Sequence, residues 1–181
     1  TFDVAGGTIN SNETFENVTI NHAGTSTLGA ALDLDDTLTI TAGALDVSGT
    51  NYGITAKSWT DAGAGTFTEG TGTVTFDVAG DTVTLTAGAL DVSGTNYGIT
   101  AKSWTDAGAG TFTEGTGTVT FDVAGGTINS NETFENVTIN HAGTTTLGAA
   151  LDLDDTLTIT AGALDVSGTN YGITAKSWTD A

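Results

Sequence analysis

The sequence predicts an all-β protein built as a parallel β-helix, a β-solenoid with about three short strands per coil of about 22 residues. Three observations carry this prediction: near-exact internal repeats, a composition with 40 Thr and 26 Gly, and short apolar–polar–apolar triplets along the chain. Thr favours strands, and Gly favours tight corners. Alternation with a period of two places one side of each strand in a core.

Two kinds of repeat unit follow one another. Residues 1–62 match residues 120–181 except that Ser26 corresponds to Thr145, and residues 41–80 match residues 86–125 without a difference. Residues 1–74 form a long unit, residues 75–119 a short one and residues 120–181 an incomplete long one. We expect one continuous segment of a longer chain, because the sequence starts inside a repeat.

The short unit lacks the 29 residues that correspond to residues 7–35. A globular domain seldom survives such a deletion, whereas a stack of coils can lose a layer and close up. The sequence therefore predicts that this block is one complete turn, so that the registers above and below it still meet.

The apolar triplets predict three inward columns when successive coils are stacked. An antiparallel β-sandwich of repeated hairpins fits the same alternation and stays as the alternative. The first column holds Val18 or Ile20, Leu38 with Ile40, Trp59, Val83 with Leu85, and Trp104; the second holds Leu28, Leu45 with Val47, Phe67, Leu90 with Val92, and Phe112; the third holds Leu32 with Leu34, Tyr52 with Ile54, Val74 with Phe76, and Tyr97 with Ile99.

The charge restricts the partners and the chemistry. With 22 acidic and 3 basic residues the formal net charge is −19, which repels phosphate backbones and anionic headgroups. We therefore expect no nucleic-acid binding and no membrane insertion, and no apolar run is long enough to span a bilayer. The sequence has no Cys and contains no nucleophile triad or phosphate-binding loop, so we expect no enzymatic activity.

Four phrases resemble repeats of large secreted bacterial surface proteins of the filamentous-haemagglutinin and autotransporter-adhesin type. They are TGTVTFDVAG, ENVTINHAGT, LTITAGALDVSG and AKSWTDAGAGTFTEGTGTV. The resemblance covers essentially the whole chain. It implies a right-handed parallel β-helix, an extracellular location at the cell surface or in the secreted fraction, and a role as stalk, adhesin or matrix fibre.

We therefore expect a non-enzymatic structural protein, a rod or filament subunit whose partners are copies of itself or continuing repeats end to end. Two alternatives stay open. An adhesin repeat region would bind a glycan or a host protein through a bulge of the longer coil, and a Thr-rich solenoid would bind ice through a lattice of outward hydroxyls. We expect Ser58-Trp59-Thr60 to interrupt that lattice, so that the Thr residues reflect strand propensity.

Two triplets of carboxylates are candidate calcium ligands, although no other cofactor is expected. Clusters of oxygen atoms suit calcium, and neighbouring coils add further ligands. The EF-hand spacing is absent, and a solvated acidic corner is the alternative. The triplets are Asp33, Asp35, Asp36 and Asp152, Asp154, Asp155.

The stretch NSNETFENVTINHAG is the candidate partner contact, because we expect the longer coil to bulge there. Its acidic and His side chains form at most a weak transition-metal set. The Trp of Lys57-Ser58-Trp59 is predicted to be an inward plug, with an exposed sugar-binding aromatic as the alternative. Contact residues are Glu13, Glu16, His22, Glu132, Glu135 and His141, and four glycosylation sequons start at Asn12, Asn17, Asn131 and Asn136.

Overall fold

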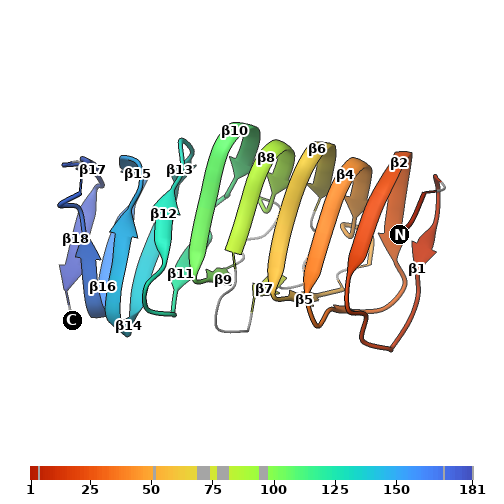
Figure 1. Cartoon of the computed structure of the whole chain (residues 1–181), viewed down its shortest axis with the longest axis horizontal. Helices are drawn as coiled ribbons and strands as arrows, with labels where there is room; N and C mark the ends of the chain where they lie inside the picture. Colours follow the sequence, from red (N-terminus) through yellow and green to blue (C-terminus); the bar gives the residue numbers. More distant parts are fainter. Residues whose placement is uncertain are drawn as a thin grey trace.

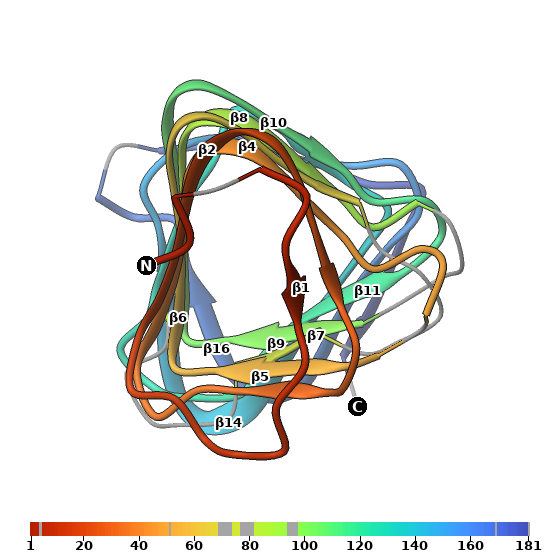
Figure 2. The same ribbon diagram turned by 90° about the vertical axis from the view of Figure 1, so that its right-hand side faces the viewer.

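The chain winds into a β-solenoid with turns of roughly 21 residues, and its described residues form no helix. The computed structural model describes residues 1–3, 5–50, 52–68, 74–76, 82–93, 98–168 and 170–180. Successive turns lie side by side along the long axis, with the termini at opposite ends (Figure 1). Seen from the N-terminal end, the outline is roughly triangular and the chain runs clockwise as it recedes (Figure 2), so the β-helix is right-handed.

Every strand pairing among the described residues is parallel, which excludes the antiparallel sandwich. The strands are β1 (Thr8–Ile9), β2 (Val18–Leu28), β3 (Leu32–Asp33), β4 (Thr37–Asp46), β5 (Ile54–Ala56), β6 (Ser58–Thr68), β7 (Val74–Phe76), β8 (Thr82–Asp91), β9 (Ile99–Ala101), β10 (Ser103–Thr113), β11 (Thr118–Phe121), β12 (Thr127–Asn129), β13 (Thr133–Phe134), β14 (Asn136–Leu147), β15 (Leu151–Leu153), β16 (Thr156–Asp165), β17 (Ile173–Thr174) and β18 (Ser177–Asp180).

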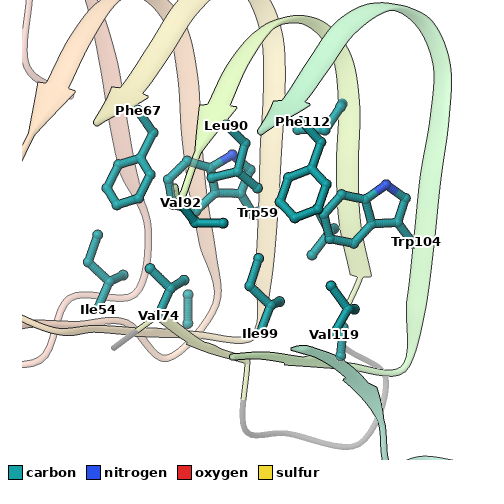
Figure 3. Close-up of a cluster of buried hydrophobic side chains, with 14 of the residues drawn as sticks. Ile54, Trp59, Phe67, Val74, Leu90, Val92, Ile99, Trp104, Phe112 and Val119 are labelled. Atoms are coloured by element: carbon teal, nitrogen blue, oxygen red, sulfur yellow. The ribbon is translucent and has the colours of Figure 1, made fainter. Parts of the chain in front are cut away.

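Three flat faces surround the core, and each is named by inward residues that follow one another from turn to turn. The first face contains Leu38, Trp59, Val83 and Trp104. The second face contains Leu45, Phe67, Leu90 and Phe112. The third face contains Ile54 and Val74, then Ile99 and Val119. Those labelled in Figure 3 point into the space between the faces. All twelve named residues are buried, which confirms their places in the predicted columns.

The strands differ from the predicted three short ones per turn, because the first and second faces share one bent strand. Strand β4, for example, runs for 10 residues across both faces, and its register with β6 shifts at the bend, between Ile40 and Ala42. Gly43 takes a φ of 81° at this corner, a conformation that Gly adopts without strain. A Cβ atom there would also overlap the carbonyl oxygen of His22 on the preceding turn.

The core is a continuous apolar column. Trp59 and Trp104 are both 0% exposed, and Trp104 packs edge-on against Phe112, with ring centroids 4.6 Å apart. Tyr52, predicted to point inward, is 36% exposed instead, because the chain turns the corner before the strand begins at Ile54. Tyr97 and the side chain of Phe76 lie outside the described residues.

The repeated sequence changes face along the chain. Leu38 and Val83, which start equivalent motifs, both lie on the first face. The third copy of this motif starts at Leu157, which pairs with Val137, and Val137 pairs with Val119 of the third face. The same sequence therefore occupies the first face near the N-terminus and the third face near the C-terminus.

The prediction that 29 residues make one turn is consequently wrong. Where the short unit begins, Val74 on the third face is followed by Val83 on the first face, one face further on. Where the second long unit begins, Val119 is followed by Leu157 on the same face, two turns further on. The block adds one turn and two thirds, or five strand segments instead of three. Every described strand segment has apolar residues on its inward side. The insertion of any whole number of segments therefore leaves the apolar core continuous.

Candidate functional site

Among the described residues, apolar side chains of the core become partly exposed at the two ends of the stack of turns. All the partly buried apolar residues that pack against the core belong to the first or last turn of the described chain. At the N-terminal end a pocket opens beside Phe2 and is lined by residues 1–3 and 5–8. The residues at the ends are Phe2, Phe15, Leu164, Val166, Tyr171, Ile173 and Ala175.

The motif Ser-Trp-Thr-Asp occurs three times. The exposed fraction of its Trp side chain depends on whether another turn lies over it. Trp59 and Trp104 are 0% exposed, whereas Trp178 is 59% exposed. Strand β8 follows β6 on the first face, and β12 follows β10, but no described strand follows β18. The predicted inward position is confirmed for Trp59 and Trp104. Trp178 pairs with Leu157 on the preceding turn, but no described turn lies over it.

Outward hydroxyls form a continuous array on the first face, which corrects the expected interruption. Because Trp59 points inward, Ser58 and Thr60 point outward and continue the column. The hydroxyl oxygens of Thr37 and Ser58 are 2.7 Å apart. The column that contains Thr60 consists of Thr19, Thr39, Thr60, Thr84 and Thr105 on successive turns.

The carboxylate triplets do not converge. Asp33 accepts a hydrogen bond from the Thr14 hydroxyl at 3.1 Å, and Asp36 accepts one from the Thr37 hydroxyl at 3.3 Å. Asp33, Asp35 and Asp36 are exposed, as are Asp152 and Asp154. Within the described residues no three His, Cys, Asp or Glu side chains are grouped to hold a metal ion, and calcium binding at these triplets stays a prediction.

Two of the six expected contact residues are buried. His22 is 7% and His141 8% exposed. Their Nε2 atoms lie 2.8 Å from the hydroxyls of Ser26 and Thr145, which are 0% exposed. The single difference between the long units therefore exchanges one buried hydroxyl for another. These histidines belong to the bend of β2 and β14, so the expectation that they face a partner is wrong. Glu13 and Glu16 are exposed.

The sequons divide into two kinds. Asn17 and Asn136 use their side chains to join turns: the Oδ1 atoms accept hydrogen bonds from the backbone N–H of Thr37 and Thr156, at 3.1 and 3.3 Å. Asn136 Nδ2 also donates to the carbonyl oxygen of Gly117 at 3.2 Å. A glycan is attached at the amide nitrogen, which at Asn136 donates to Gly117, whereas Asn12, Asn17 and Asn131 are exposed.

The sequence analysis missed two buried carboxyl groups. Asp61 is 1% exposed and lies in the inward column between Ile40 and Leu85. Burial raises its pKa to about 6, against a weaker opposing effect of the Gly63 N–H, and its Oδ2 atom has no hydrogen-bond partner. The signal was present, since strict alternation in Ser58-Trp59-Thr60-Asp61 turns Asp61 inward together with Trp59.

The second buried carboxyl group, Asp106, has an acidic neighbour, Glu132. Asp106 is 2% exposed and shares a side-chain hydrogen bond with Glu132 on the following turn. Burial raises the pKa of Glu132, and the charge and hydrogen bond of Asp106 add to the rise against a Phe112 backbone contact. Glu114 also has a raised pKa, first through burial and then through Asp154, Glu135 and Glu132.

Comparisons with protein-family models, curated proteins and solved structures give no match. No helix of the described chain is long and apolar enough to cross a membrane.

Proposed function

We propose that the chain is a segment of a non-enzymatic structural rod that grows by stacking turns end to end. The observation that carries this proposal is the parallel stacking of equivalent inward residues from turn to turn, as in Leu38, Trp59, Val83 and Trp104 on the first face. An exposed parallel edge with an apolar interior favours addition of another strand. The partner is therefore further repeats or another copy of the same chain.

The proposed location is outside the cell, at the surface or in a matrix. The quoted phrases resemble secreted bacterial repeats, and the acidic sides support a rod that stays soluble along its length. With 22 acidic residues, lateral contact between two rods brings like charges together. Growth at the ends alone, rather than sideways, follows from this charge distribution.

Sedimentation velocity over a range of concentrations, paired with negative-stain microscopy, tests the proposal. We expect particles of constant width whose length increases with concentration. Trp178→Glu places a charge on the open end and abolishes the increase. Thr60→Glu is the matched control, because it adds the same charge to the side of the same motif in mid-rod. Association that is equally sensitive to both variants, or width that grows with length, overturns the proposal.

The hydroxyl array favours a second candidate, binding to ice. The two hydroxyl columns of the first face repeat about every 4.8 Å between turns and roughly 6.6–7 Å along a strand, close to the oxygen repeats of ice. Thermal hysteresis of the purified chain tests it. We expect Thr84→Lys on the first face to abolish hysteresis and Thr66→Lys, exposed on the second face, to preserve it. A chain without hysteresis removes this candidate.

A further inference from the structure

The strand ladder of the second face stops between β10 and β13. Phe112 of β10 pairs with Leu90 on the preceding turn, and Phe134 of β13 pairs with Leu153 on the following turn. Among the described residues no strand pairing joins β10 to β13, although the ring centroids of Phe112 and Phe134 are 5.7 Å apart. The apolar column of the second face therefore continues through a level at which its backbone ladder does not.

The other two faces stay paired at this level. On the first face, Trp104 of β10 pairs with Ile128 of β12. On the third face, Val119 of β11 pairs with Ile99 before it and with Val137 after it. An interruption on one face out of three has the geometry of a hinge, because two faces hold the turns together while the third is free to separate.

The sequence of β10 is not the cause of the interruption, because the same sequence forms a continuous ladder elsewhere. Residues 58–70 and 103–115 are identical, and in the first copy Phe67 pairs with Leu90 on the following turn. The difference lies in the turn that follows. Strand β8 runs for 10 residues across two faces, whereas β12 ends at Asn129 after 3 residues, and a bend separates it from β13.

A carboxyl group takes the place of the missing ladder bond. The Glu132 carboxyl accepts a hydrogen bond from the Phe112 N–H and shares another with Asp106. Ser130, which is 3% exposed, fixes the bend, because its Oγ atom accepts a hydrogen bond from the Glu132 N–H at 3.1 Å. Paired strands are joined by backbone amides, which do not titrate. At this level the second face is joined by a group that does.

The groups that act on this contact are all acids. Glu132 faces Asp106 of β10. Glu114, which follows β10, is affected by Asp154 after β15, by Glu135 after β13 and by Glu132. Burial raises the pKa of both Glu132 and Glu114, and these neighbouring carboxyl groups raise it further. Ionisation therefore adds like charges on both sides of the interruption, where they repel one another.

We propose that the second face opens locally between β10 and β13 when these carboxyl groups ionise and closes when they are protonated, so that the chain contains a pH-dependent hinge. Opening brings the Glu132 carboxylate into water and separates Phe112 from Phe134, while the first and third faces stay paired. This inference goes beyond the proposed function, since it concerns a single chain and requires no association.

The direction of the pH dependence follows from the site at which the proton binds more tightly. The pKa of Glu132 is raised above its ordinary value of 4.5 in the closed form. Closing is therefore fully favoured below pH 4.5, and it is lost as pH rises through the raised pKa. Acidification stiffens the chain at this level, and neutral pH loosens it.

Hydrogen exchange of two Phe amides tests the hinge. Phe67 and Phe112 have identical neighbours in sequence, so their intrinsic exchange rates are equal at any pH, and the ratio of the measured rates compares local opening at the two places. Nuclear magnetic resonance of the dilute monomer with isotope-labelled phenylalanine measures both amides in one sample. We expect the rate of Phe112 relative to Phe67 to rise roughly tenfold between pH 4 and pH 7.5. A ratio that is equal at both pH values overturns the proposal.

Glu132→Gln separates the charge from the hydrogen bond, because the amide oxygen still accepts from the Phe112 N–H. We expect this variant to keep the low ratio of pH 4 at pH 7.5 as well. Glu13→Gln is the matched control, since Glu13 is the sequence equivalent of Glu132 and is exposed, and it should keep the pH dependence of the unmodified chain. The Phe67 amide reports in each variant that the remaining turns are folded. A pH dependence that persists unchanged in Glu132→Gln, or that is lost equally in Glu13→Gln, overturns the hinge and leaves the proposed rod untouched.

Discussion

Glu132 and Asp106 share a side-chain hydrogen bond at the edge of an otherwise apolar core. Burial raises the pKa of Glu132, and the charge of Asp106 and the hydrogen bond with it raise this pKa further. Asp61, the counterpart of Asp106, is buried without an acidic neighbour in its column. We therefore expect the stability of the folded chain to depend on the ionisation of Asp61 and of Glu132.

Replacing Asp61 by Asn should stabilise the protein at neutral pH. The folded-state pKa of about 6 exceeds the ordinary value of 3.8. Below pH 3.8 both states are protonated; as pH rises toward 6 the unfolded state ionises first, and the folded state loses stability relative to it. At about 1.4 kcal/mol per pKa unit, the gain of Asp61→Asn at pH 7.5 is roughly 3 kcal/mol.

Urea unfolding at pH 7.5 and pH 4 measures this effect for Asp61→Asn. The gain should vanish at pH 4. Asp180→Asn is the control, because Asp180 occupies the same place in the motif but is exposed, and it should change neither midpoint. A loss of stability of equal size at both pH values would show that desolvation does not govern this carboxyl.

Replacing Glu132 by Gln should likewise raise the urea midpoint at pH 7.5 and leave it unchanged at pH 4. The amide keeps a hydrogen bond to Asp106 but removes the charge whose pKa the burial raises. Glu13→Gln is the control, because Glu13 is the sequence equivalent of Glu132 in the first long unit and is exposed. Equal midpoint shifts in the two variants would contradict the role of the buried pair.

The inward columns were predictable from sequence because alternation is local: the side of a strand on which a residue lies depends only on its neighbours. The same rule, applied without regard to polarity, turns Asp61 and His22 inward. His22 was expected at the surface as a contact residue, and Asp61 was not considered, because charged and titratable groups are seldom fully buried. At both positions the alternation gives the observed inward direction.

The rotation between repeat units was not predictable in the same way. A turn has no fixed length: Trp104 pairs with Ile128, 24 positions on, whereas Phe121 pairs with Ile139, 18 positions on. Corners absorb the difference, so a residue count does not give a count of turns. An inserted block has to contain a whole number of strand segments. Because three segments make one turn, a block of five segments places the following repeat on a different face.

Trp104→Ala should destabilise the chain by about 3–5 kcal/mol, because it empties the space between Phe112 and Phe134. Trp178→Ala removes the same side chain from the same motif and should change the stability of the dilute monomer by less than about 0.5 kcal/mol, since Trp178 is largely exposed. Equilibrium unfolding at low concentration checks both values. Acrylamide quenching of the unmodified monomer should accordingly report one accessible indole out of three.

Asn136→Ala should cost more stability than Asn17→Ala although the two residues occupy equivalent positions. Asn136 loses two hydrogen bonds, one to Gly117 O and one from Thr156 N–H, whereas Asn17 loses the bond from Thr37 N–H. At about 1 kcal/mol per hydrogen bond, the expected losses are roughly 2 and 1 kcal/mol. The difference arises because a turn precedes Asn136 and offers it a carbonyl oxygen. Urea unfolding of both variants measures it, and equal losses would mean that the bond to Gly117 contributes nothing to holding successive turns together.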